Sequence, residues 1–133
     1  RYYNQVSPNV YVGNAKSREV EHRPKKCRAC LSLTLRDFRK PKWAKSYLFL
    51  SLRDRASEDR SHVLHCIAQS VAFIAEHLEE GVLVHCGMGV SRSGMAAVAH
   101  VMSTLSLDPL SALSMVQSRR QCILPNEGGE GIE

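Results

Sequence analysis

Hydrophobic positions along the chain follow a helical spacing in one long segment and form short clusters elsewhere. Between residues 63 and 78 they recur at steps of three and four, which is the spacing of one face of an α-helix. This set comprises Val63, Ile67, Val71, Ile74 and Leu78, and Glu79-Glu80-Gly81 ends the pattern. A second helix is expected over 91–107, apolar nearly all round and therefore central. A third is expected over 109–119, with proline in its first turn and arginine near the negative end of the helix dipole.

Short apolar runs predict strands at 29–34, 47–52 and 82–84. The segment 6–13 is also β-prone, but Pro8 confines it to a sheet edge or a turn. Since helical segments alternate with these strands, the pattern indicates an α/β layer architecture.

Composition narrows the class of protein without specifying its chemistry. The chain has 133 residues, 44% of them hydrophobic and 23% charged, as in an ordinary globular domain. Those values exclude a disordered tail, a collagen-like repeat and a disulfide scaffold. The longest stretch without formal charge, 94–107, is shorter than the roughly 20 apolar residues of a transmembrane helix, so no membrane span is expected.

Signals for cellular location and partners are weak. No secretory signal is visible at the start, and five cysteines make an odd count, which favours a reducing, cytoplasmic or nuclear setting. The net charge of +5 favours anionic partners, although a solvated basic face explains it equally. Only Phe38 and Trp43 lie among the basic runs, so no nucleic-acid partner is expected.

The segment around Cys86 carries the chemistry. The apolar run 82–84 leads through His85 and Cys86 into a glycine-containing turn, and the helix at 91–107 begins at once. Such a turn directs backbone N–H groups inward as an anion site, and the helix N-terminus adds further donors. Arg92 offers a planar fork to two phosphate oxygens. A cysteine held there as a thiolate is a nucleophile for phosphorus; the plainer alternative is a buried structural cysteine beside a turn.

His85-Cys86-x5-Arg92-Ser93 resembles the signature of the cysteine-dependent protein tyrosine phosphatases, and its Gly-x-Ser-Arg-Ser ending resembles the dual-specificity branch. Two further segments, 10–14 and 119–126, resemble the opening and closing motifs of those domains. The resemblance implies a single catalytic domain over 1–133, with a central, mostly parallel sheet of four to five strands flanked by helices. It implies no metal or other cofactor. The tail from about 127 lacks the aromatic residue and helix usual in the family.

The resemblance also assigns roles to residues of the loop. Cys86 would attack phosphorus, and Arg92 would hold the phosphate oxygens. His85 would position the loop and tune the thiolate, and Ser93 would assist departure of the sulfur. The substrate-binding set is His85, Gly87, Met88, Gly89, Val90, Ser91 and Arg92.

A proton donor for the leaving group must come from one of four aspartates. Asp54 follows the expected strand 47–52 directly, where dual-specificity domains place their general acid. Asp59 is the second candidate, although we expect it to face solvent near a helix start. Asp37 lies in a basic segment, and Asp108 lies at the far end of the central helix.

The expected function is therefore a signalling protein phosphatase acting on phosphotyrosine and phosphoserine or phosphothreonine in protein substrates. Three alternatives remain: a phosphoinositide or RNA 5′-phosphatase of the same fold, a phosphate-binding module without turnover, and a rhodanese-like sulfur transferase. Cys27 and Cys30 are expected to pack on opposite faces of a strand. Cys66 or Cys122 could protect oxidised Cys86.

Overall fold

Five strands form one sheet in the order β1-β2-β5-β3-β4, in a computed structural model that describes residues 2–53 and 58–120. The strands are β1 (Tyr3–Ser7), β2 (Val10–Gly13), β3 (Ala29–Thr34), β4 (Ser46–Ser51) and β5 (Val82–His85). β1 pairs antiparallel with β2, and the other three pairings are parallel. The mostly parallel sheet expected from the sequence is therefore confirmed, with β5 at its centre.

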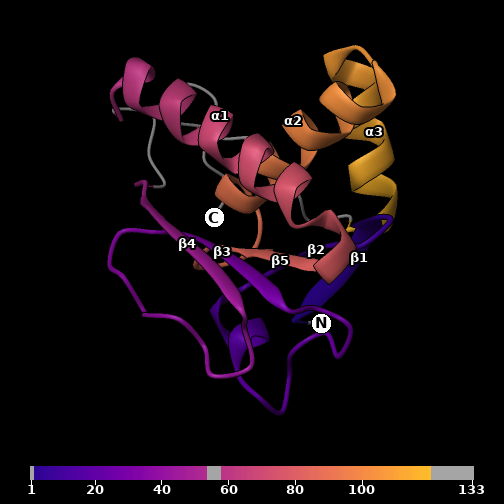
Figure 1. Ribbon diagram of the computed structural model, residues 1–133. Coiled ribbons are helices and arrows are strands. Elements are labelled where there is room, and N and C mark those ends of the chain that lie inside the picture. The colour runs from indigo at the N-terminus through magenta and orange to yellow at the C-terminus, as the bar shows by residue number, and fades with distance from the viewer. Residues whose placement is uncertain (1, 54–57, 121–133) are drawn as a thin grey trace.

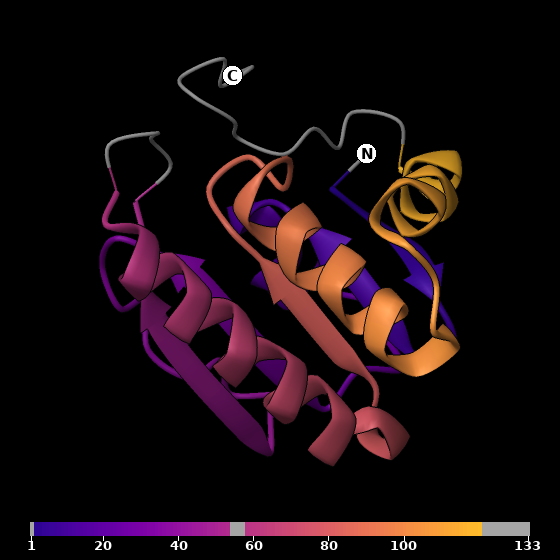
Figure 2. The same ribbon diagram turned by 90° about the horizontal axis from the view of Figure 1, so that it is seen from above.

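Three α-helices lie together on one face of the sheet (Figure 1), and Figure 2 shows them from above. They are α1 (Arg60–Glu76), α2 (Arg92–Leu105) and α3 (Pro109–Arg119). Two short 3-10 helices, η1 (Ala15–Arg18) and η2 (Leu78–Glu80), complete the elements of the described chain. None of its helices combines the length and apolarity needed to cross a membrane.

Most boundaries agree closely with the sequence predictions. The predicted strand 29–34 and helix 109–119 have the bounds of β3 and α3. The β-prone segment 6–13 divides instead into two strands at Pro8, because Asn9 adopts a left-handed conformation (φ 63°) that closes a hairpin. Proline thus lies in the turn, as one of the two predicted options allowed.

The buried face of α1 is not centred on the predicted stripe. Its fully buried residues are Cys66, Ser70, Phe73 and Ile74. Val63, Ile67 and Val71 are only half-buried. The spacing of apolar residues thus predicted the helix correctly, but most of the residues that it predicted to be buried are only half-buried. α1 shares the main hydrophobic cluster with the sheet through Phe73 and Ile74, and it also packs against α2.

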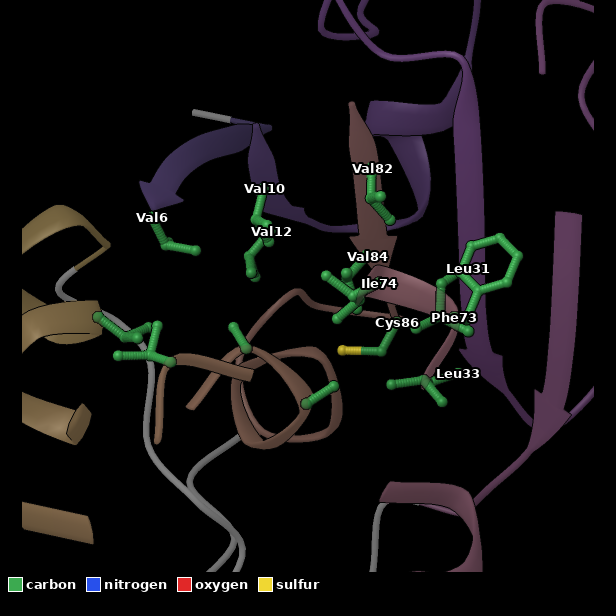
Figure 3. Close-up of a cluster of buried hydrophobic side chains, with 14 of the residues drawn as sticks. Val6, Val10, Val12, Leu31, Leu33, Phe73, Ile74, Val82, Val84 and Cys86 are labelled. Atoms are coloured by element: carbon green, nitrogen blue, oxygen red, sulfur yellow. The ribbon is translucent and has the colours of Figure 1, made fainter. Parts of the chain in front are cut away.

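Successive side chains of β5 point to opposite faces of the sheet and therefore belong to two different hydrophobic clusters. Val82 and Val84 belong to the main hydrophobic cluster under the helices, drawn in part in Figure 3, whereas Leu83 packs with Tyr11 and Cys27 on the other face. By the same alternation, His85 lies on the face of Leu83, away from the helices. The end of this strand therefore turns two successive side chains, His85 and Cys86, toward different environments.

Candidate active site

Cys86 lies where β5 ends at the centre of the sheet, a position at which parallel α/β sheets commonly bind ligands. The side chain is 2% exposed and belongs to the main cluster, part of which Figure 3 shows. Its sulfur lies 3.2 Å from the Ser93 hydroxyl and accepts a 3.5 Å hydrogen bond from the Ser93 N–H. The first turn of α2 thus supplies two polar groups to the sulfur, since that helix begins at Arg92.

Two carbonyl groups of the loop are tied to the surrounding frame. The Gly87 carbonyl accepts a 3.1 Å hydrogen bond from the Ala15 N–H, and the Gly89 carbonyl accepts one of 2.8 Å from Arg120 Nε. In a trans peptide the carbonyl and the following N–H point in opposite directions. The N–H groups of Met88 and Val90 are therefore directed away from those anchors, toward the opposite side of the loop, in the orientation an anion site requires.

Gly89 permits a close approach between this loop and β2. Its φ is +70°, and a Cβ there would lie 2.5 Å from the carbonyl carbon of Gly13. Beside this contact, the Cys86 N–H donates to the Gly13 carbonyl at 3.3 Å. The sequence pattern showed the glycines of the loop but not this partner segment, which precedes the loop by more than 70 residues.

Arg120 is a contributor to the site that analysis of the loop motif alone did not find. It is 5% exposed, and besides its bond to the Gly89 carbonyl it donates from Nη1 to Asn4 Oδ1 at 2.7 Å. The guanidinium therefore joins β1 to the loop. Its only sequence signal was the resemblance of 119–126 to a closing motif, which gave no contact.

Arg92 faces a pocket of about 590 Å³ that it lines together with Gly87 and residues 34–38. Its Nη1 donates to the Leu52 carbonyl at 3.0 Å, which holds the guanidinium against the end of β4. Its Nε is buried without a hydrogen-bond partner within the described chain. Buried donors are normally paired, so this arrangement suits a bound anion.

His85 lies on the other side of the strand from the sulfur. Its Nε2 is 2.5 Å from Ser32 Oγ, a cross-strand neighbour in register, and 3.4 Å from Arg18 Nη1. Burial, reinforced by the positive charge of Arg18, lowers the pKa of His85 to about 3. The ring is therefore neutral near pH 7, and its contacts suit a residue that positions the strand end.

The structure places three of the four aspartates. Asp54 lies outside the described residues, so its role as acid stays a prediction. Asp59 is exposed at the N-terminus of α1, as expected, and Asp108 accepts a hydrogen bond from the Ser111 N–H at the start of α3. Asp37 does line the pocket, but hydrogen bonds from the Tyr47 hydroxyl and the Arg39 N–H lower its pKa and keep it ionised.

The remaining cysteines in the described chain are buried and free. The expectation that Cys27 and Cys30 face opposite ways is wrong: Cys27 precedes β3 and packs on Leu83, the residue with which Cys30 is in register. Burial raises the pKa of Cys27 to about 12 and that of Cys30 to about 11, so both are poor nucleophiles. Cys122 lies outside the described residues.

Comparison with known proteins decides the family. The family model described as "Dual specificity phosphatase, catalytic domain" matches residues 10–129. The chain belongs to that family. It is 36% identical over 129 residues to dual specificity protein phosphatase 22 of Xenopus tropicalis, covering 94% of this chain and 60% of the relative. It is also 34% identical over 94 residues to the mouse serine/threonine/tyrosine-interacting protein, covering 69% and 42% of the two chains.

Solved structures show the same fold. The human tyrosine phosphatase-like serine/threonine/tyrosine-interacting protein superposes with a TM-score of 0.81 at 27% identity, covering 95% of this chain and 89% of that one. The chain spans about 60% of the length of the Xenopus tropicalis phosphatase and less than half of the mouse relative. The activity, substrates and partners of the whole protein are therefore matters for proposal.

Proposed function

We propose that this dual-specificity phosphatase domain hydrolyses phosphotyrosine and phosphoserine or phosphothreonine monoesters of proteins through a cysteinyl-phosphate intermediate on Cys86. The observation that carries the proposal is the shared geometry of the loop: the Cys86 sulfur beside Ser93, with Arg92 and Gly87 lining one pocket. Phosphoryl transfer depends mainly on positioning and charge stabilisation, which these groups supply. The free cysteines fit a reducing intracellular compartment.

In the first step the Cys86 thiolate attacks phosphorus from the side opposite the leaving oxygen. A phosphorus–sulfur bond forms as the phosphorus–oxygen bond breaks. Arg92 and the N–H groups of the loop bind the three remaining oxygens, whose negative charge must be held throughout. The leaving oxygen takes a proton from the carboxylic acid of Asp54, which restores the neutral phenol or alcohol.

In the second step a water molecule attacks the cysteinyl phosphate. Asp54, now a carboxylate, removes a proton from this water, and inorganic phosphate is released. The sulfur departs as a thiolate, and the hydrogen bond between Ser93 and the sulfur stabilises this leaving group. His85 acts from behind the strand as a positioning residue, because its ring bonds to Ser32 and Arg18.

The experiment is hydrolysis of a small aryl phosphate without added metal. We expect Cys86→Ser to abolish turnover, while Cys66→Ser, a matched change at another buried cysteine, keeps it. Asp54→Asn should lower the rate by about 10²–10⁴ and remove one arm of the pH profile. Burst kinetics should show one phosphoryl group retained per wild-type chain before steady turnover.

The leading alternative is a module that binds phosphate without turnover, favoured by the similarity to relatives named as interacting proteins. If wild type and Cys86→Ser are equally inactive, the hydrolytic proposal fails. Titration with a phosphopeptide then tests the alternative, which requires Arg92-dependent binding. Activity restricted to a phosphoinositide or an RNA 5′-phosphate would instead overturn the protein substrate alone.

A further inference from the structure

Phe38 is an exposed aromatic residue in the lining of the pocket that contains Arg92. It is 49% exposed and also lines a second hollow of about 700 Å³, formed mainly by residues 15, 16, 18–21, 41 and 42. The exposed surface of such a large apolar ring is removed from water only when another group packs against it. The Phe38 ring therefore presents apolar surface to the same pocket as Gly87 and Arg92 of the loop.

The Phe38 ring is in contact with the side chains of Arg18 and His85. The Arg18 guanidinium carbon lies 5.3 Å from the centre of the Phe38 ring, and the His85 ring centre lies 6.1 Å away in a stacked arrangement. Arg18 also donates to the Phe38 carbonyl at 3.4 Å. These contacts join the ring to the same His85 and Arg18 pair that lies at the end of β5.

The segment that carries Phe38 is also ordered by side chains around it. Asp37 accepts a hydrogen bond from the Arg39 N–H at 2.8 Å and another from the Tyr47 hydroxyl. Thr34 Oγ1 donates to the Arg36 carbonyl at 2.7 Å. These bonds stabilise the left-handed conformation of Arg39, whose φ is 71°. Because residues 34–38, which line the pocket, are ordered before substrate binds, binding costs less conformational entropy than it would with a loop that must first become ordered.

The nucleophile is almost completely buried, since Cys86 is only 2% exposed. Leu35 and Phe38 line one pocket together with Gly87 and Arg92, which belong to the loop that follows Cys86. A phosphate carried on a phenyl ring can reach the loop while the ring remains beside Leu35 and Phe38. A phosphate on serine or threonine has only the Cβ carbon between its ester oxygen and the peptide backbone, and cannot use the same contact.

We propose that Phe38 is a specificity-determining residue that packs against the phenyl ring of phosphotyrosine, so that the domain prefers aryl over alkyl phosphate esters. The inference rests on the proposed phosphatase function and names the favoured substrate class. Aromatic rings attract each other edge-to-face or offset, and such pairs contribute about 0.5–1.5 kcal/mol beyond burial. The corresponding gain in discrimination is about 2- to 12-fold.

The test compares kcat/KM for two peptides of identical sequence, one carrying phosphotyrosine and the other phosphothreonine. Wild type should favour the phosphotyrosine peptide. Phe38→Leu, which keeps an apolar side chain without the ring, should lower the ratio by about 2- to 12-fold. Phe38→Tyr should restore the ratio. Leu110→Ala, which removes an exposed apolar side chain from α3, serves as the control and should leave it unchanged.

The readout separates specificity from support of the loop. If Phe38 only props His85 and Arg18, Phe38→Leu lowers kcat/KM for both peptides equally, and the inference is overturned. An unchanged ratio in Phe38→Leu with full activity overturns it as well. Wild type inactive toward aryl phosphate and both peptides removes the phosphatase function itself. An active wild type with no preference removes only this inference.

Discussion

On the helix-covered face of the sheet, β5 contributes Val82 and Val84 to an apolar cluster that extends through α1, α2 and α3. On the opposite face the same strand contributes Leu83 to a small cluster and His85 to a polar group with Ser32 and Arg18. The first face provides most of the buried apolar surface. The second provides less burial but connects the strand end to the wall of the pocket.

The two faces of the sheet contribute differently: the helix-covered face mainly stabilises the fold, and the opposite face mainly supports the geometry of the loop. Burial of apolar groups is tolerant of exact position, whereas transfer of a phosphoryl group is sensitive to displacements of about 1 Å. We therefore expect changes in the helix-face cluster to act mainly on unfolding. Changes among the groups that anchor the loop should act mainly on catalysis.

The largest effect is expected at Arg92. Arg92→Lys keeps the positive charge but loses the planar fork that binds two phosphate oxygens, and it disturbs the bond to the Leu52 carbonyl. We expect kcat/KM for an aryl phosphate to fall by about 10²–10³, as when one oxyanion donor is removed. Arg119→Lys, an exposed arginine on α3, is the matched control. A thermal midpoint several degrees below wild type would contradict the separation.

A change in the other face should do the reverse. Ile74 is fully buried against the sheet, and Ile74→Ala leaves a cavity that lowers the free energy of unfolding by about 2–4 kcal/mol. Chemical denaturation measures that loss. At a temperature well below its unfolding transition, the variant should retain kcat/KM within about 2-fold, because no loop anchor has moved. A 100-fold loss would show that the helix face also sets the geometry of the loop.

Local sequence predicted the parts of this molecule that local chemistry determines. β3 is a short, mostly apolar segment, α3 begins with proline after the capping Asp108, and the loop of Cys86 has its glycines and arginine within a few residues. The anchors of the loop could not be read this way. Gly13 and Arg120 reach it because β2 pairs with β5 and because α3 returns beside β1.

The burial of α1 shows the same limit. Its apolar spacing identified a helix, but its buried positions are Cys66, Ser70, Phe73 and Ile74, of which only Ile74 belongs to the predicted stripe. Likewise, His85 is in register with Ser32 only because β3 and β5 are neighbours in the sheet. Strand order, which no periodicity encodes, decides such contacts.

A smaller effect should follow from loosening the loop without touching its chemistry. Arg120→Lys cannot reproduce both the bond to the Gly89 carbonyl and the bond to Asn4. Loss of a buried, charge-assisted hydrogen bond costs about 1.5–3 kcal/mol. We expect kcat/KM to fall about 10- to 30-fold, in kcat more than in KM, with the adjacent Arg119→Lys as control. An equal effect of the two substitutions would remove Arg120 from the loop's support.

The smallest effect is expected when the pH is lowered, and it concerns His85, which lies with Ser32 and Arg18 on the sheet face opposite the helices. The pKa of His85 is about 3 in the folded protein and about 6.5 in an unfolded chain, so between these values the unfolded chain binds an extra proton. The contribution of this group therefore disfavours folding as pH falls below about 6.5, with a limiting slope of about 1.4 kcal/mol per pH unit. Above that pH the ring is neutral in both states and the effect vanishes.

Urea unfolding of wild type and His85→Gln at pH 7.5, 6.5 and 5.5 isolates this effect, because Gln does not titrate. His100, whose pKa burial also lowers, titrates in both proteins and cancels in the difference. The stability lost in His85→Gln at pH 7.5 should shrink by about 1.4 kcal/mol at pH 5.5, because only wild type is destabilised by protonation of His85 in its unfolded chain. A difference independent of pH would mean that His85 has the same pKa in the folded protein as in the unfolded chain and is therefore protonated in the folded protein at pH 5.5. In that case a positive charge would lie one residue from Cys86, and His85 would not be a neutral positioning residue for the loop.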